Sequence, residues 1–162
     1  VNIKNFHMPI ILISILVAFF SNYGSVIVLI EPLTFIKIDL GSYKNGYVSF
    51  NSFETTYMQN NEWWRLISPM FIHFSLTHLV FNCLWIYVLG SKIEQIDGHI
   101  TFINLVIFSS IISNLAQHFF GESALFGGLS GVIYGLLGYC MIIEIDTILT
   151  NFEVHRSYRI WP

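Results

Sequence analysis

The stretch GGLSGVIYGLLGYCMII, residues 127–143, places Ser130 among glycines at the start of a long apolar run. A serine hydroxyl in an apolar environment needs a hydrogen-bond partner, and glycines carry no side chain that would hold a neighbour away. Such a run is typical of a tightly packed transmembrane helix, because small residues let membrane helices approach closely. A second interpretation is a serine nucleophile that works inside the membrane. The choice between them depends on residues elsewhere in the chain.

The composition indicates an integral membrane protein. Of the 162 residues, 54% are hydrophobic and only 10% are charged, whereas soluble domains carry about 25% charged residues. The net charge of −3 is small, and no basic stretch interleaves with aromatic residues, so we expect no nucleic-acid partner. Cys83 and Cys140 lie in apolar segments without metal-ligand spacing and are interpreted as small hydrophobic residues.

Four apolar blocks approach the length of about 20 residues that a spanning helix requires. The sequence therefore predicts an all-α polytopic membrane protein, with residues 1–162 forming one domain. The first helix has a signal peptide as its alternative, although no small-residue cleavage site follows it. The helices are expected at residues 9–30, 75–90, 100–120 and 128–145.

Residues 31–65 contain no apolar block long enough to span and are expected to form a large extramembrane loop. Its aromatic side chains fit two interpretations equally well. They suit the headgroup region of a bilayer, where amphipathic rings collect, or a core inside the loop itself. These residues are Tyr43, Tyr47, Phe50, Phe53, Tyr57, Trp63 and Trp64.

The fourth predicted helix carries a glycine every four residues, at Gly127, Gly131 and Gly135. This spacing forms a stripe of small residues suited to close contact with another helix. The contact is expected within the domain, because Ser130 borders the same stripe. A homodimer face is the alternative.

Two polar side chains share one face of the second predicted helix. His78 and Asn82 are four residues apart, so they lie one above the other. Polar groups at membrane depth are costly and usually face a cavity or a partner. The alternative to a functional role is a hydrogen bond to a neighbouring helix. His73 is five residues from His78, off that face, and no carboxylate or cysteine sits at ligand spacing. We therefore expect no metal site.

Together, the serine and the polar pair suggest acyl transfer. A serine that attacks an amide generates an oxyanion, which aimed hydrogen-bond donors stabilise. The His78 imidazole, the Asn82 amide and the backbone N–H of Ser130 would supply such donors. A helix that begins near Ser130 would also favour negative charge at its N-terminus.

At this point the sequence resembles a known family. His73-x4-His78-x3-Asn82, followed by Gly128-Leu129-Ser130-Gly131, resembles the rhomboid intramembrane serine proteases, especially their bacterial GlpG-like members. The pair Trp64-Arg65 is similar to the Trp-Arg pair in that family's first loop. The two longer motifs together are specific, whereas either alone is a weak signal.

The resemblance implies a fold, a chemistry and a location. The fold would be a rhomboid-like bundle containing four of the usual six core helices, in a bacterial inner membrane. The substrates would be single-span membrane proteins cut near the outer end of their helix, without a cofactor. The implied roles are Ser130 as nucleophile, His78 and Asn82 as oxyanion donors, His73 as a structural or water-retaining residue at the mouth of the site, Gly128 and Gly131 as shapers of the loop, and Arg65 as the anchor of the first loop.

The family's general base is a histidine on a sixth helix, in an Ala-His-x2-Gly-x3-Gly pattern that this sequence lacks. His155 is expected on the opposite side of the membrane from Ser130, and His118 matches no family position, so neither is assigned as the base. A serine without a base is a weak nucleophile. The expectation is a chain truncated after its fourth helix and inactive as given.

Two other classes of function remain as alternatives. One is an inactive rhomboid-like module that binds membrane proteins for quality control. The other is a small channel or transporter that uses His73, His78 and Asn82 as a polar path. The pair of broken helices typical of transporters is not evident in the sequence.

Overall fold

A computed structural model describes residues 5–42 and 48–157, and its described part is all-α. The long helices are α1 (His7–Phe20), α3 (Leu76–Ile96), α4 (Gly98–Phe120) and α5 (Ser130–Ser157), with a short α2 (Ile27–Ile30) after α1. Between α2 and α3, the described residues form five short helical turns: η1 (Glu31–Leu33), η2 (Leu40–Ser42), η3 (Glu54–Gln59), η4 (Trp63–Leu66) and η5 (Ser68–Phe71). Within the described ranges, the nearest feature to a strand is an isolated bridge between Ile38 and Phe50.

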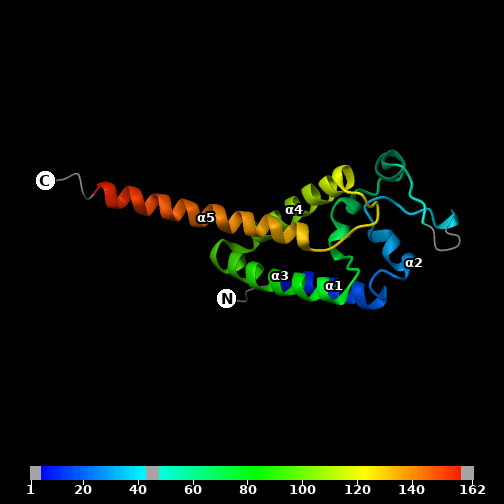
Figure 1. The fold of residues 1–162 in the computed structure, drawn as a ribbon, viewed down its shortest axis with the longest axis horizontal. Helices are drawn as coiled ribbons and strands as arrows, with labels where there is room; N and C mark the ends of the chain where they lie inside the picture. The colour runs from blue at the N-terminus through cyan, green and yellow to red at the C-terminus, as the bar shows by residue number, and fades with distance from the viewer. Residues whose placement is uncertain (1–4, 43–47, 158–162) are drawn as a thin grey trace.

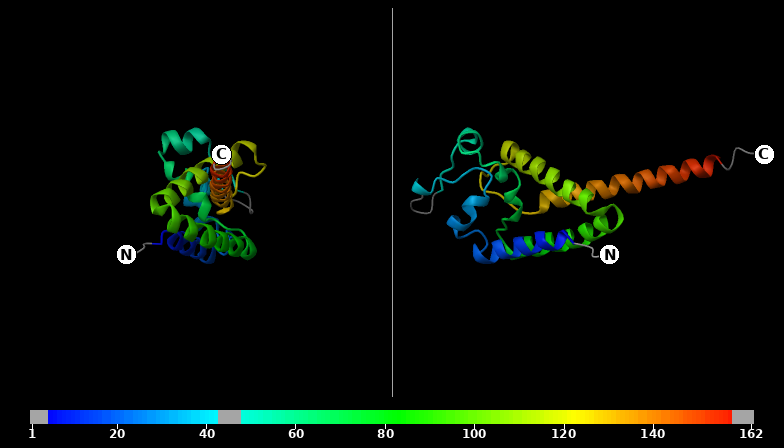
Figure 2. Two further views of the ribbon diagram at one scale, coloured as in Figure 1. Left: turned by 90° about the vertical axis from the view of Figure 1, so that its left-hand side faces the viewer. Right: turned by 180° about the vertical axis from the view of Figure 1, so that it is seen from behind.

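The long helices form two layers. In Figures 1 and 2, α1 lies alongside α3, and α4 and α5 pack over them, with α5 extending beyond the bundle. The core between the layers is aliphatic around one ring, Phe102 of α4. Its other fully buried members are Ile86 of α3, Leu129 just before α5, and Val132 and Leu136 of α5.

Two helices among the described residues, α3 and α4, are long and apolar enough to cross a membrane. The apolar helix α1 is shorter than that length. The predicted first span, residues 9–30, is therefore wrong as a continuous helix. Asn22, Tyr23 and Gly24 all adopt positive φ angles, of 47°, 53° and 78°, and this left-handed turn ends the helix.

The second predicted helix ends too early, because α3 continues past residue 90 to Ile96. The segment between the second and third predicted helices contains Glu94, which is only 5% exposed. Its carboxylate accepts hydrogen bonds from the backbone N–H and the ring Nδ1 of His7, at 2.9 and 3.0 Å. Because His7 of α1 provides hydrogen bonds to its carboxylate, Glu94 can lie buried within α3 without ending that helix. The chain then turns at Gly98, whose φ is +85°.

The loop before α3 has its own small core, which consists of Phe35, Ile36 and Tyr57. Trp63 and Trp64, in contrast, are about half exposed. The structure therefore supports a core inside the loop itself for the buried aromatic residues, whereas a headgroup position for the exposed ones stays a prediction. Tyr43 and Tyr47 lie outside the described residues.

Candidate active site

Ser130 begins α5 directly after a tightly enclosed loop. The backbone N–H of Gly128 donates to the Pro69 carbonyl at 3.1 Å. A Cβ at Gly127 would lie 2.7 Å from the Ile72 Cβ, which is closer than packed atoms tolerate. Leu129 is fully buried in the core. The loop therefore holds Ser130 at a fixed position, with glycine where η5 leaves no room for a side chain.

Gly128 brings the two predicted motifs together. A Cβ at Gly128 would lie 2.5 Å from Cε1 and 2.9 Å from Nε2 of His78, and 3.4 Å from Nδ2 of Asn82. The imidazole and the amide therefore border the backbone two residues before Ser130. His78 is half-buried and Asn82 is buried. Both project from the first turns of α3, where the Ser75 hydroxyl caps the helix by accepting from the His78 N–H.

His73 is fully buried just before α3. Its Nδ1 lies 3.2 Å from the Phe71 carbonyl oxygen, and its Nε2 lies 3.0 Å from Nδ2 of Asn82. Its ring also contacts the His78 ring, with 5.1 Å between centroids. The structure thus joins all three polar residues of the motif, including the histidine that is off the shared face.

Arg65 anchors the loop from within. It is 2% exposed and donates to the carbonyls of Glu31 and Thr34 and to the carboxylates of Glu31 and Glu62. Burial raises the pKa of Glu62, but its hydrogen bonds and ion pairs with Lys37 and Arg65 outweigh burial, so its net pKa is lowered. The first loop is therefore held by a cation that bonds both backbone and carboxylate groups.

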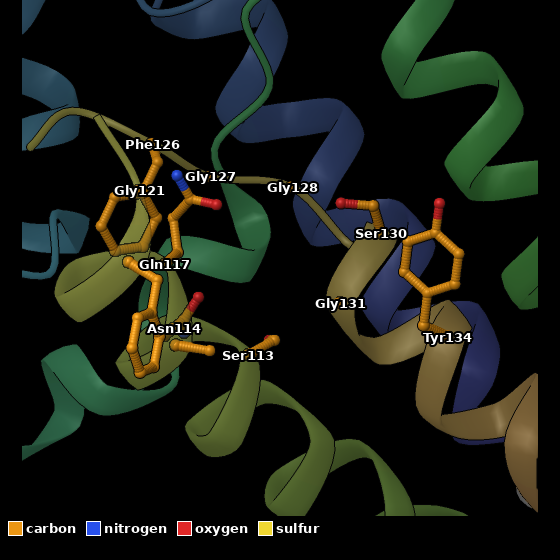
Figure 3. Close-up of a pocket in the computed structure, with 12 residues that line it drawn as sticks. Ser113, Asn114, Gln117, Gly121, Phe126, Gly127, Gly128, Ser130, Gly131 and Tyr134 are labelled. Carbon is orange, nitrogen blue, oxygen red and sulfur yellow. The ribbon is translucent and has the colours of Figure 1, made fainter. Parts of the chain in front are cut away.

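A cavity of about 400 Å³ opens beside Ser130. Figure 3 shows Ser130 and Tyr134 on its α5 side, and Ser113 and Gln117 on its α4 side. Gly131 packs directly on Ser113, since a Cβ there would collide with the Ser113 hydroxyl. No histidine is among the described residues that line this cavity.

The two histidines considered as bases are not placed at this cavity. His118 stacks within the loop's aromatic cluster, against Phe35 and Phe53, with 5.0 and 6.0 Å between centroids. His155 lies near the far end of α5, and its side chain is outside the described residues. Among the described residues, no group of three metal-ligating side chains occurs.

Two features were missed from the sequence. Asn114 and Ser110 of α4 donate to the carbonyls of Leu66 and Ile67, at 2.8 and 3.2 Å, and so attach α4 to the loop. The Glu94–His7 pair is the other. The available signal was the presence of polar residues inside apolar blocks, which usually have a partner, but the partner could not be read from local sequence.

The model of the Rhomboid domain matches residues 60–157. The chain belongs to the rhomboid family. The rhomboid match includes His73, His78, Asn82 and Ser130, and the family's all-α membrane fold agrees with the helices described above. The rhomboid chain is accordingly an integral membrane protein.

Individual relatives point to the same family. The rhomboid chain is 47% identical over 79 residues to the Rhomboid protease GlpG of Serratia proteamaculans, which covers 49% of this chain and 28% of the relative. It is 44% identical over 78 residues to the Rhomboid protease GlpG of Klebsiella pneumoniae, a match that covers 48% of this chain and 28% of the relative. It is 45% identical over 76 residues to the Rhomboid protease GlpG of Yersinia pestis, a match that covers 47% of this chain and 27% of the relative. The matched part thus spans less than a third of these relatives.

Proposed function

We propose that this rhomboid chain carries the nucleophile and oxyanion donors of an intramembrane serine endopeptidase. The observation that supports the proposal is the contact of His78 and Asn82 with Gly128, two residues before Ser130. The substrates would be transmembrane segments of membrane proteins in a bacterial inner membrane. No cofactor takes part in the proposed chemistry.

The proposed reaction is acyl transfer. The Ser130 Oγ attacks the scissile carbonyl carbon, and the carbonyl electrons move to oxygen. The His78 ring N–H, the Asn82 amide and the Ser130 backbone N–H would stabilise that oxyanion. Collapse breaks the C–N bond, the amine leaves with a proton, and water then hydrolyses the acyl-enzyme. Each oxyanion donor is expected to contribute about 10²–10³ in kcat.

Deprotonation of Ser130 needs a base, and the histidines of the described residues do not supply one at the cavity. The proposal therefore includes inactivity of the 162-residue chain by itself. Activity would require a base other than the histidines of the described residues.

The test is cleavage of a model transmembrane substrate by the full-length protein in liposomes. Ser130→Ala should abolish cleavage, and Ser113→Ala, which alters the same cavity across from Ser130, should retain it. Equal cleavage by wild type and Ser130→Ala would overturn the assignment of the nucleophile. Cleavage by the 162-residue chain would overturn only the inactivity claim.

The alternative is an inactive module that binds membrane proteins. The apolar, partly open site beside Ser130 also suits that role. Binding of a labelled transmembrane peptide that survives Ser130→Ala, in a protein that never cleaves it, would favour this alternative.

A further inference from the structure

His73 makes two hydrogen bonds whose directions fix its protonation. The Phe71 carbonyl can only accept, so Nδ1 must carry the hydrogen. The Asn82 Nδ2 can only donate, so Nε2 must present a lone pair. The two contacts together define a neutral imidazole with its hydrogen on Nδ1.

The environment of the ring agrees with a neutral state. His73 is fully buried. Burial is the largest influence and lowers its pKa to about 4, the Phe71 carbonyl acts in the opposite direction, and His78 lowers it further. At neutral pH Nε2 is therefore an acceptor.

This acceptor constrains the Asn82 amide. An Asn amide group has two N–H bonds and can flip between two orientations. Because one N–H bonds to His73, the amide nitrogen Nδ2 is held toward Gly128, 3.4 Å from the position that a Cβ would take there. The second N–H remains for a ligand beside Gly128. In the flipped orientation, Asn82 would present an oxygen, which repels an oxyanion.

We propose that His73 is a positioning residue, which holds the Asn82 amide with its N–H groups toward the oxyanion position and packs against the His78 ring. This role rests on the proposed function of Ser130, His78 and Asn82. It replaces the water-retaining role implied by family resemblance, because both ring nitrogens of His73 bond to protein groups. A misplaced donor costs up to about 10²-fold in rate.

Two substitutions separate this role from simple packing. In His73→Asn, the shorter side chain can keep the bond to Phe71 but cannot reach Asn82. In His73→Gln, the longer side chain can offer its oxygen to Asn82. We expect kcat to fall about 10–100-fold in His73→Asn, with KM unchanged, and to recover at least partly in His73→Gln. Equal losses in both variants, in parallel with lower thermal stability, would overturn the proposal.

A double substitution tests whether His73 acts through Asn82. Once Asn82→Ala has removed the amide, His73→Asn should lower kcat no further. Losses that multiply would show that His73 acts independently of Asn82 and would contradict the positioning role.

A measurement without catalysis separates this inference from the proposed function. Imidazole ¹⁵N NMR of the full-length protein, with His73 assigned by its loss in His73→Asn, should show a protonated Nδ1 and an unprotonated Nε2 at pH 7. The side-chain amide signal of Asn82 should shift in His73→Asn and much less in His73→Gln. A protonated Nε2 would overturn the inference, whereas correct ¹⁵N signals in a protein that does not cleave would contradict only the proposed function.

Discussion

Gly128 is the residue at which backbone strain and the candidate site meet. Its φ of +118° disfavours any L side chain, and a Cβ would lie 2.5 Å from His78 Cε1. We therefore expect Gly128→Ala to displace His78 and lower kcat at least about 100-fold, since a misplaced group costs that much. Unfolding in detergent should show a loss of about 1–3 kcal/mol from the strained backbone.

Gly138→Ala is the matched control on α5. Nothing lies within 4 Å of a Cβ there, so alanine should be neutral or stabilising by up to about 1 kcal/mol through its higher helix propensity. If Gly128→Ala behaved like Gly138→Ala in both activity and stability, the close contact with His78 would be refuted.

His73 should give the protein a measurable pH dependence of stability. Its pKa is lowered from 6.5 to about 4 in the folded protein, so the unfolded chain binds the proton first as the pH falls. Its contribution is complete above pH 6.5 and is lost as the pH falls toward 4, where the cost reaches about 3 kcal/mol. The free energy of unfolding, measured between pH 7 and pH 4, should fall less steeply in His73→Asn than in wild type.

Among the elements, α4 and α5 meet through pairs of serine and glycine. A Cβ at Gly135 would collide with the hydroxyl of Ser109 and lie 2.5 Å from its Cβ. We expect Gly135→Ala to destabilise the protein by about 1–3 kcal/mol, as overpacking does. Adding Ser109→Gly should remove the collision and restore stability to within about 1 kcal/mol, the cost of glycine in a helix.

The loop between α2 and α3 should depend strongly on Arg65. Replacing it by Met leaves two buried carbonyls and two carboxylates without their cation, at an expected cost of about 3–5 kcal/mol. Arg65→Lys should not rescue the loop, because an ammonium cannot reproduce the planar fork of donors. Lys37→Met, which removes a partly exposed ion pair with Glu62, should cost only about 0–1 kcal/mol. Limited proteolysis of the loop provides the measurement, and equal effects of Arg65→Met and Lys37→Met would contradict the anchoring role.

The helix expected at residues 100–120 corresponds closely to α4. The helix expected at 128–145 ends too early, because α5 continues through the polar residues after 145 to Ser157. The first span was overextended because Ile27–Ile30 continues the apolar pattern beyond the left-handed turn at Asn22 and Tyr23. The second helix was predicted too short because charged residues such as Glu94 usually indicate a loop, and its partner His7 lies 87 positions away in the sequence.

The candidate active site was predictable from the sequence only in part. The shared face of His78 and Asn82 follows from their spacing of four. Their contact with Gly128 joins residues about fifty positions apart, and only resemblance to a family could suggest it. The bond between His73 and Asn82 was not predicted, because five residues separate the two histidines and His73 precedes the helix.

At the scale of the whole molecule, Glu94 joins three helices at the end opposite Ser130. It pairs with His7 of α1, and His99 of α4 lies 3.7 Å from the same carboxylate oxygen. Glu94→Gln would exchange one of its two acceptor oxygens for an amide donor, so we expect stability to fall by about 2–3 kcal/mol, as for hydrogen bonds to charged groups.

The kinetic effect of Glu94→Gln should differ from its effect on stability. Below the unfolding transition, kcat and KM should match wild type, because the substitution leaves the contacts of His78, Asn82 and Gly128 in place. Lys92→Gln is the control, since Lys92 is exposed on the same end of α3 and should change stability by less than about 0.5 kcal/mol. A Glu94→Gln protein with wild-type stability would contradict the stabilising role of Glu94. A lowered kcat in the fully folded variant would contradict the expectation that this end of the bundle affects stability alone.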